Sequence, residues 1–111
     1  MFLIEKKLKA LANKNRLRII KMLEKEDLCV CEITAVLGIK QPSVTGHLLK
    51  LKEAGIIGER QKGLFTEFFL LREETLIELQ REILKIINNV PQVKRDSLKI
   101  KTIDRYKLVK K

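Results

Sequence analysis

Two cysteines, Cys29 and Cys31, are the residues of this sequence best suited to chemistry, and one residue separates them. At this spacing two thiols make a poor framework for a structural disulfide and a better pair of thiolate ligands for a soft metal ion. The pair falls where a helix is expected to begin, and a helix N-terminus favours thiolate over thiol. We therefore predict a soft-ion site here, with two small apolar side chains filling a helix start as the structural alternative.

The spacing also constrains how the two sulfurs can act together. Residues i and i+2 of a regular helix point about 200° apart, so Cys29 and Cys31 can meet on one ion only if the first turn unwinds or the helix begins later. Ion binding is therefore expected to remodel the start of the helix. A disulfide within the pair would be strained, whereas reversible oxidation between subunits or with a small thiol would use the same residues.

The sequence lacks the groups that an enzyme needs for catalysis. The sequence has a single histidine, His47, and it has neither a glycine-rich phosphate loop nor a paired nucleophile motif. We therefore predict that the protein is not an enzyme and requires no cofactor.

The elements that must position the cysteines centre on residues 32–55. Apolar residues at helical spacing predict two short helices that share one core face, with Gly38 as the turn between them. Pro42 is tolerated in the first turn of the second helix, and Gly55 is expected to end that helix in a left-handed conformation. The apolar stripes consist of Ile33, Val36, Leu37, Val44, Leu48 and Leu51. This pattern predicts a helix-turn-helix.

The second of these helices has small and polar residues opposite its apolar stripe, and such a face suits the major groove of DNA. A glycine in mid-helix costs about 1 kcal/mol relative to alanine, and close approach to the DNA backbone would explain Gly46. His47 lies toward the core side, where a packed or helix-bridging imidazole is the alternative to a base contact. The candidate DNA-contacting residues of this helix are Gln41, Ser43, Thr45, Gly46, His47 and Lys50. An ordinary solvated surface helix is the structural alternative.

Residues 56–71 change from helical to extended patterning around a Lys62-Gly63 turn, which predicts a β-hairpin. Arg60 and Lys62 lie near the tip of this hairpin, where their side chains are expected to reach phosphate or the minor groove. A solvated turn is the alternative for these charges. A helix-turn-helix followed by a hairpin predicts a winged helix, a fold that is mainly α with a small β-hairpin.

Helical periodicity also predicts helices at residues 2–12 and 14–25 before this unit and at residues 73–89 after it. The first and last of these carry more apolar surface than one small domain covers, so we expect both to pack across the two-fold axis of a homodimer. Packing on the monomer core is the alternative. The predicted interface residues are Ile4, Leu8, Leu11, Leu76, Leu79 and Ile83.

Composition is typical of a small protein that binds nucleic acid. We expect a winged-helix DNA-binding and dimerisation domain at residues 1–91 and a basic tail at residues 92–111, which forms either a strand or a mobile arm. The formal net charge is +10, of which the tail holds +6, so a polyanion is the favoured partner. No segment has the pattern of a membrane span or a secretory signal, so we expect a cytoplasmic protein.

The order of these elements, together with three short motifs, resembles the ArsR/SmtB family of winged-helix, metal-responsive repressors over roughly residues 5–89. The motifs are Leu11-Ala12-Asn13 through Arg16-Leu17-Arg18-Ile19, Leu28-Cys29-Val30-Cys31-Glu32-Ile33, and Gln41-Pro42-Ser43-Val44-Thr45 with His47-Leu48. The resemblance implies a homodimer that represses at an inverted repeat in double-stranded DNA and dissociates when a thiophilic metal binds the cysteines. As(III) or Sb(III) is the inducer we expect.

The sequence also departs from that family. Some members of the family carry a third thiolate three residues after the second cysteine, and that position is Thr34 here. Position 46, usually basic in the family, is Gly46. Other members bind zinc through histidine and carboxylates on the terminal helix, or cadmium and lead through added N-terminal cysteines, and this sequence lacks both sets. The alternatives are a thiol-based redox repressor with the same fold and a basic protein that coats nucleic acid without sequence preference.

Overall fold

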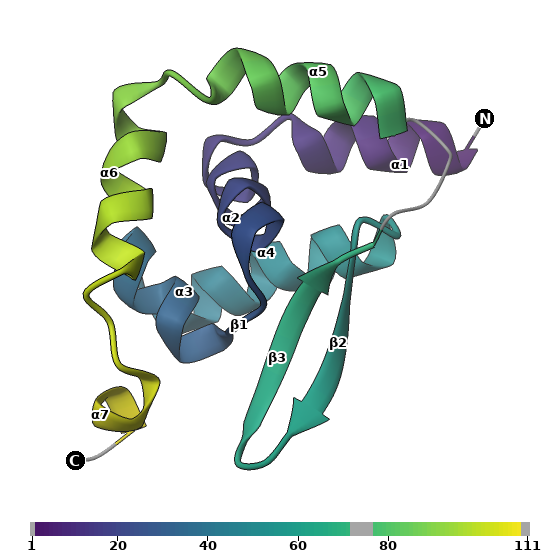
Figure 1. Cartoon of the computed structure of the whole chain (residues 1–111). Coiled ribbons are helices and arrows are strands. Elements are labelled where there is room, and N and C mark those ends of the chain that lie inside the picture. The colour runs from purple at the N-terminus through teal and green to yellow at the C-terminus, as the bar shows by residue number, and fades with distance from the viewer. Residues whose placement is uncertain (1, 72–76, 110–111) are drawn as a thin grey trace.

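The computed structural model of the chain describes residues 2–71 and 77–109, with side chains described at 4–71 and 81–108 (Figure 1). Seven helices and three strands follow one another within these residues, and none of the helices is long and apolar enough to cross a membrane. In chain order the elements are α1 (Phe2–Leu11), α2 (Lys14–Lys25), β1 (Leu28–Cys29), α3 (Val30–Leu37), α4 (Gln41–Glu53), β2 (Ile57–Lys62), β3 (Phe65–Leu70), α5 (Ile77–Ile87), α6 (Pro91–Ile100) and α7 (Arg105–Val109).

Helix α2 forms the centre of the core, and its bounds are those predicted from the sequence. Asn13 caps it, because the Asn13 side-chain oxygen accepts a hydrogen bond of 3.1 Å from the backbone N–H of Arg16. Ile19 and Ile20 are fully buried. Helix α1 is linked to the residue that follows α4, because Nζ of Lys7 donates a hydrogen bond to the carbonyl oxygen of Gly55.

Helices α3 and α4 form the predicted helix-turn-helix. Gly38 ends α3 with φ 69°, a left-handed conformation that glycine adopts without strain, and Gly55 follows α4 with φ 74°. Pro42 lies in the first turn of α4, where no helical N–H is lost. The two apolar stripes pack into one core, which includes Ile33, Val36, Leu37, Val44, Leu48 and Leu51.

The wing is an antiparallel sheet of three strands in the order β1-β3-β2. The predicted hairpin is present, with its two-residue turn at Gly63 and Leu64 rather than at Lys62 and Gly63. Strand β1 was not predicted, since a two-residue strand has no detectable periodicity. It pairs Cys29 with Glu67 on β3, and Glu67 also pairs with Arg60 on β2.

The C-terminal segment differs from its prediction. The prediction of a strand or a mobile arm at residues 92–111 is wrong, because Pro91–Ile100 forms helix α6 and Arg105–Val109 forms helix α7. Helix α6 packs on α2 and α3, with Val93 and Asp96 buried in the contact, and α7 packs on α3 (Figure 1). Apolar and ionic contacts with distant helices, rather than the local alternation of apolar and basic residues, therefore decide the conformation here.

Candidate DNA-binding surface and thiol site

The two thiols meet at the junction of β1 and α3. Cys29 is the last residue of β1 and the N-cap of α3, with extended backbone (φ −88°, ψ 165°), while Cys31 lies in the first helical turn. The helix thus begins after Cys29, which is one of the two arrangements that the Cys-x-Cys spacing allows. Both cysteines are free, and their Sγ atoms lie 2.7 Å apart. The sulfurs are therefore positioned to share one ligand.

Glu32 fixes the position of Cys29. Its Oε1 accepts a hydrogen bond of 2.9 Å from the backbone N–H of Cys29, which completes the first turn of α3. Glu32 is itself buried, so its carboxylate is a negative group close to the thiol.

Cys29 is not a thiolate at neutral pH, contrary to the expectation from its place at a helix N-terminus. Burial, followed by the contact with Cys31 and the proximity of the Glu32 carboxylate, raises the pKa of Cys29 to about 12. Cys29 is only 2% exposed, so the effect of burial, which raises its pKa, outweighs the effect of the helix N-terminus, which favours the thiolate. A ligand must therefore displace the Cys29 proton.

The two cysteines have no third protein ligand of the usual kinds nearby. Among residues 2–71 and 77–109, no group of three or more His, Cys, Asp or Glu side chains could hold a metal ion. The hydroxyl of Thr34 donates a hydrogen bond of 2.7 Å to the carbonyl oxygen of Val30, so it already has a partner within α3. A third ligand would come from water, hydroxide or a small thiol.

Most of the predicted DNA-contacting residues lie on the surface of α4. A Cβ built at Gly46 would meet no atom within 4 Å beyond its chain neighbours and the backbone of its own helix, so packing among the described residues does not require glycine there. The exposed predicted residues of this helix are Gln41, Ser43, Thr45, Gly46 and Lys50.

His47 differs from these residues, because its ring is half-buried and contacts α2. The Nδ1 atom lies 3.3 Å from Nη1 of Arg16, and Arg16 Nε donates a hydrogen bond of 2.7 Å to the carbonyl oxygen of Ala10. Burial, with the charge of Arg16 as a second cause, lowers the pKa of His47. His47 therefore bridges helices, the structural alternative that its position on the helix suggested.

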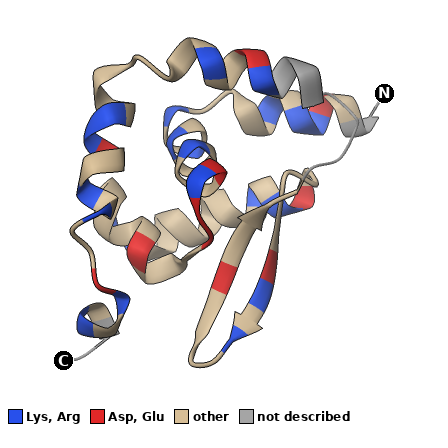
Figure 2. Cartoon of the chain, viewed as in Figure 1, with Lys and Arg blue, Asp and Glu red and all other residues tan. Residues whose placement is uncertain are grey.

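The two predicted wing residues are presented differently. Lys62 is exposed at the end of β2, beside the turn that carries the exposed Leu64. Basic and acidic segments both lie along the hairpin (Figure 2). Arg60 lies further from the tip, forms an ion pair with Asp27, and places its guanidinium 4.8 Å from the centroid of the Phe69 ring. Lys62 is thus the more available of the two cations for a phosphate.

The residues predicted to form the dimer interface differ in how exposed they are on the single chain. Leu11 lies in the core of the single chain and is 5% exposed, so it offers little surface to a partner subunit. Leu8 is 43% exposed, whereas Ile4 is half-buried and Ile83 packs against the core. The remaining two predicted residues, Leu76 and the side chain of Leu79, lie outside the described residues.

Arg105 and Glu67 lie beside the thiol site, and the sequence did not reveal either of them. Arg105 on α7 forms ion pairs of 2.9 Å with both Glu32 and Glu67. No local pattern identifies these partners, because Arg105 is 73 positions from Glu32 and 38 from Glu67.

Known proteins are similar to this chain in sequence and in fold. A family model described as bacterial regulatory protein, arsR family, matches residues 13–58, from the cap of α2 to the second residue of β2. The arsenic resistance transcriptional regulator ArsR1 of Pseudomonas putida is 41% identical over 63 residues, which are 56% of this chain and 49% of that protein. The arsenical resistance operon repressor of Bacillus subtilis is 32% identical over 80 residues, which are 71% of this chain and 76% of that protein. The chain belongs to the ArsR family.

A solved structure agrees with the fold of this ArsR-family chain. The homodimeric winged helix-turn-helix DNA-binding domain Mb0332 of Mycobacterium bovis superposes with a TM-score of 0.67 at 23% identity, covering 78% of this chain and 79% of that one. The prediction of a winged helix is therefore confirmed. The ArsR-family relatives are transcriptional regulators rather than enzymes, which confirms the predicted class; this chain spans about half the length of the Pseudomonas putida relative.

Proposed function

We propose that this ArsR-family regulator is a DNA-binding repressor that leaves its operator when As(III), Sb(III) or another thiophilic ion binds Cys29 and Cys31. One observation carries the proposal: the two Sγ atoms lie 2.7 Å apart at the start of α3, and α3 packs directly on α4. The names of the relatives from Pseudomonas putida and Bacillus subtilis connect those proteins with arsenic resistance, which supports the choice of ion.

The proposed complex with DNA is symmetrical. Two copies of the chain bind an inverted repeat, each with α4 in the major groove and the wing beside it. The exposed Leu8 on α1 and the 75% exposed Ile86 on α5 support a homodimer formed through these two helices, because large apolar side chains on a monomer surface favour burial against a partner.

Ion capture changes the start of α3. An ion bound to both sulfurs sets the Sγ–Sγ distance through its own bond lengths and bond angle, so Cys29 and Cys31 must rearrange to accept it. Cys29 cannot move without disturbing its hydrogen bond to Glu32. Because α3 and α4 share one core, the displacement changes the position of the reading helix in each subunit and weakens the fit to two half-sites.

The chemistry of capture balances without an oxidant. Arsenous acid, As(OH)3, exchanges two hydroxides for two thiolates, and the two thiol protons leave with those hydroxides as two molecules of water. The third position on arsenic keeps a hydroxide or takes a small cellular thiol. The raised pKa of Cys29 is compatible with this reaction, since the departing hydroxide accepts the proton.

A thiol-based redox repressor is the second candidate, and the partial exposure of Cys31 favours it. Oxidation by peroxide requires an accessible thiolate, and Cys29 is buried with a raised pKa. The half-buried Cys31 would therefore react first, with a small thiol or the partner subunit as the second sulfur.

Titration of a repressor–operator complex tests the proposal. Operator duplexes are first selected from a random-sequence library, and binding is followed by fluorescence anisotropy under anaerobic conditions with a monothiol reductant. Arsenite should release the wild-type protein and generate sulfur-to-arsenic absorbance, while Cys29→Ser and Cys31→Ser should retain DNA binding and lose both responses. Release by diamide or peroxide, with no release by arsenite, would refute the metalloid mechanism in favour of the redox one.

The same DNA measurements separate a specific repressor from a protein that coats nucleic acid. A repressor should prefer its selected operator to random duplex by about 10³-fold or more at stated salt, whereas a coating protein shows little preference. Sedimentation at micromolar concentration tests the dimer, and a monomer there would exclude the proposed inverted-repeat complex.

A further inference from the structure

Helix α7 brings one guanidinium between the thiol site and the wing. The Nη2 atom of Arg105 lies 2.9 Å from Oε1 of Glu32, and its Nη1 atom lies 2.9 Å from Oε2 of Glu67. Both carboxylates are buried, and the side chain of Arg105 is itself mostly covered. One cation therefore pairs with two acids that come from α3 and β3.

The contact with Glu32 reaches Cys29 directly. The same oxygen, Oε1, accepts both the Arg105 N–H and the backbone N–H of Cys29. A carboxylate that holds both donors cannot rotate freely, since it would lose one hydrogen bond to improve the other. Arg105 thus holds in place the acceptor that defines the backbone of Cys29.

The contact with Glu67 reaches the wing. Glu67 lies on the central strand of the sheet, opposite Cys29 on one side and Arg60 on the other. Its second oxygen, Oε1, is 3.7 Å from Nη2 of Arg60 and accepts no hydrogen bond from the described residues. The side chains of Glu32, Arg105, Glu67 and Arg60 therefore alternate in charge from the start of α3 to strand β2.

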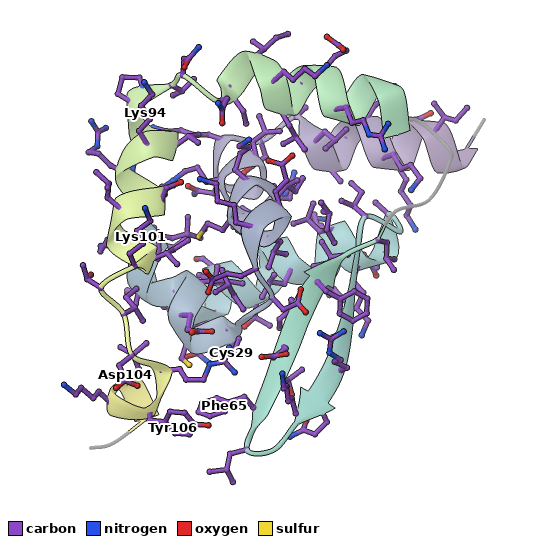
Figure 3. The ribbon with its side chains drawn as sticks, viewed as in Figure 1. Cys29, Phe65, Lys94, Lys101, Asp104 and Tyr106 are labelled. Carbon is purple, nitrogen blue, oxygen red and sulfur yellow. The ribbon has the colours of Figure 1, made fainter. Side chains whose placement is uncertain are left out.

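Aromatic packing adds a second attachment of α7 to the wing. The Arg105 guanidinium lies 5.1 Å from the centroid of the Phe65 ring, and the ring of Tyr106 meets Phe65 edge-to-face at 5.4 Å (Figure 3). Phe65 is the first residue of β3, next to the turn of the hairpin, and it is buried. We call Arg105 and Tyr106 the α7 clasp, because together they hold the end of the wing.

We propose that Arg105 is a positioning residue for the thiol site, and that the α7 clasp transmits a change at Cys29 to the wing. This inference rests on the proposed function and adds its coupling step. When an ion displaces Cys29, Glu32 moves with it, and Arg105 carries the displacement to Glu67 and Phe65. The wing therefore changes position together with α4, so both DNA-contacting elements respond to one ion.

Three variants test the clasp. Arg105→Ala removes both ion pairs, and Glu67→Gln removes only the charge on the wing side. Arg95→Ala is the matched control, because Arg95 is an exposed arginine on α6 whose recorded contact is with Gln92. Arg105→Lys, which keeps the charge without the two-pronged geometry, serves if Arg105→Ala unfolds in a thermal melt.

The first measurement needs neither ion nor DNA. The rate at which iodoacetamide alkylates Cys29, followed by peptide mass spectrometry on the full chain, should rise by about tenfold in Arg105→Ala, because the start of α3 opens more often without its fixed cap. Glu67→Gln and Arg95→Ala should keep the wild-type rate. An unchanged rate in Arg105→Ala and in Arg105→Lys would overturn the positioning role.

The second measurement tests transmission. The operator dissociation constant with arsenite, divided by that without arsenite, should fall by about fivefold in both Arg105→Ala and Glu67→Gln and stay unchanged in Arg95→Ala. Equal ratios in all four proteins would overturn the coupling. Failure of arsenite to release the wild type would refute the proposed function and the coupling together, while the alkylation rates would still decide whether Arg105 positions Cys29.

Discussion

The guanidinium of Arg18 and the carboxylate of Asp96 form a two-pronged ion pair, with Nε 2.8 Å from Oδ2 and Nη2 2.9 Å from Oδ1. Asp96 is 3% exposed, and Gln92 donates a further hydrogen bond of 2.8 Å to its Oδ1 atom. The pair joins α6 to α2, so it decides where the C-terminal segment lies and places α7 next to the thiol site.

Asp96→Ala should therefore lower the free energy of unfolding by about 3 kcal/mol, because the mostly covered Arg18 would lose its ionic partner. Urea denaturation followed by circular dichroism measures this change. The double variant Arg18→Met/Asp96→Leu should recover most of the loss, since it leaves no buried charge. A loss of less than about 1 kcal/mol in the single variant would show that the pair behaves as an exposed one.

Gly46→Ala should raise the free energy of unfolding by about 1 kcal/mol while it weakens operator binding. The stabilisation follows because the added methyl group meets no atom within 4 Å beyond its chain neighbours and the backbone of its own helix, and the weakening follows if α4 lies against DNA at this residue. Thermal melts and anisotropy measure the two effects. As a control, Gly38→Ala should destabilise, because its φ of 69° strains any side chain. Unchanged operator affinity in Gly46→Ala would place this residue away from the DNA.

His47 should make stability depend on pH below neutrality. Its folded pKa is lowered below the ordinary value of 6.5, so the unfolded state binds the proton more readily. The stability gained from the neutral ring is complete above pH 6.5 and decreases as pH falls below that value, until the folded state also binds the proton. Urea denaturation at pH 5 to 8 should show a smaller decrease for His47→Gln than for the wild type; parallel profiles would contradict this origin.

Binding of Cd2+ should release protons. The pKa of Cys29 is raised to about 12, so its thiol is protonated at neutral pH and must lose that proton to ligate the ion. Affinity should therefore increase by about tenfold per pH unit for each proton displaced. Competition with a fluorescent chelator from pH 6 to 8 measures the slope, and Cys29→Ser should reduce it by about one proton. A flat profile would mean that Cys29 does not bind the ion as a thiolate.

Local sequence patterns predicted the helices whose ends are set by residues close to them in the sequence. Asn13 before an amphipathic stripe defined the start of α2, and Gly38, Pro42 and Gly55 defined the reading unit. These residues act through backbone geometry and capping, which depend on near neighbours in the sequence.

Other features depend on residues far apart and were therefore missed or misassigned. Asp96 is buried because of Arg18, 78 positions away, so α6 carried no signal that distinguished it from a basic strand. The pKa of Cys29 depends on burial that only the folded chain creates. Leu11 has the same spacing as an exposed apolar residue, and only the packing of α1 shows that it belongs to the core.

The pairing of β1 with β3 also affects how the chain folds. Leu28 pairs with Phe68, so this two-residue strand closes a loop that contains all of α3, α4 and β2. A long loop costs entropy that few local contacts repay, which makes the pairing a late step in folding. Loss of this pairing should consequently free β1 and the central strand of the wing in one opening, so that the residue proposed to sense the ion and the wing unfold as one cooperative unit; amide hydrogen exchange along β3 measures that opening.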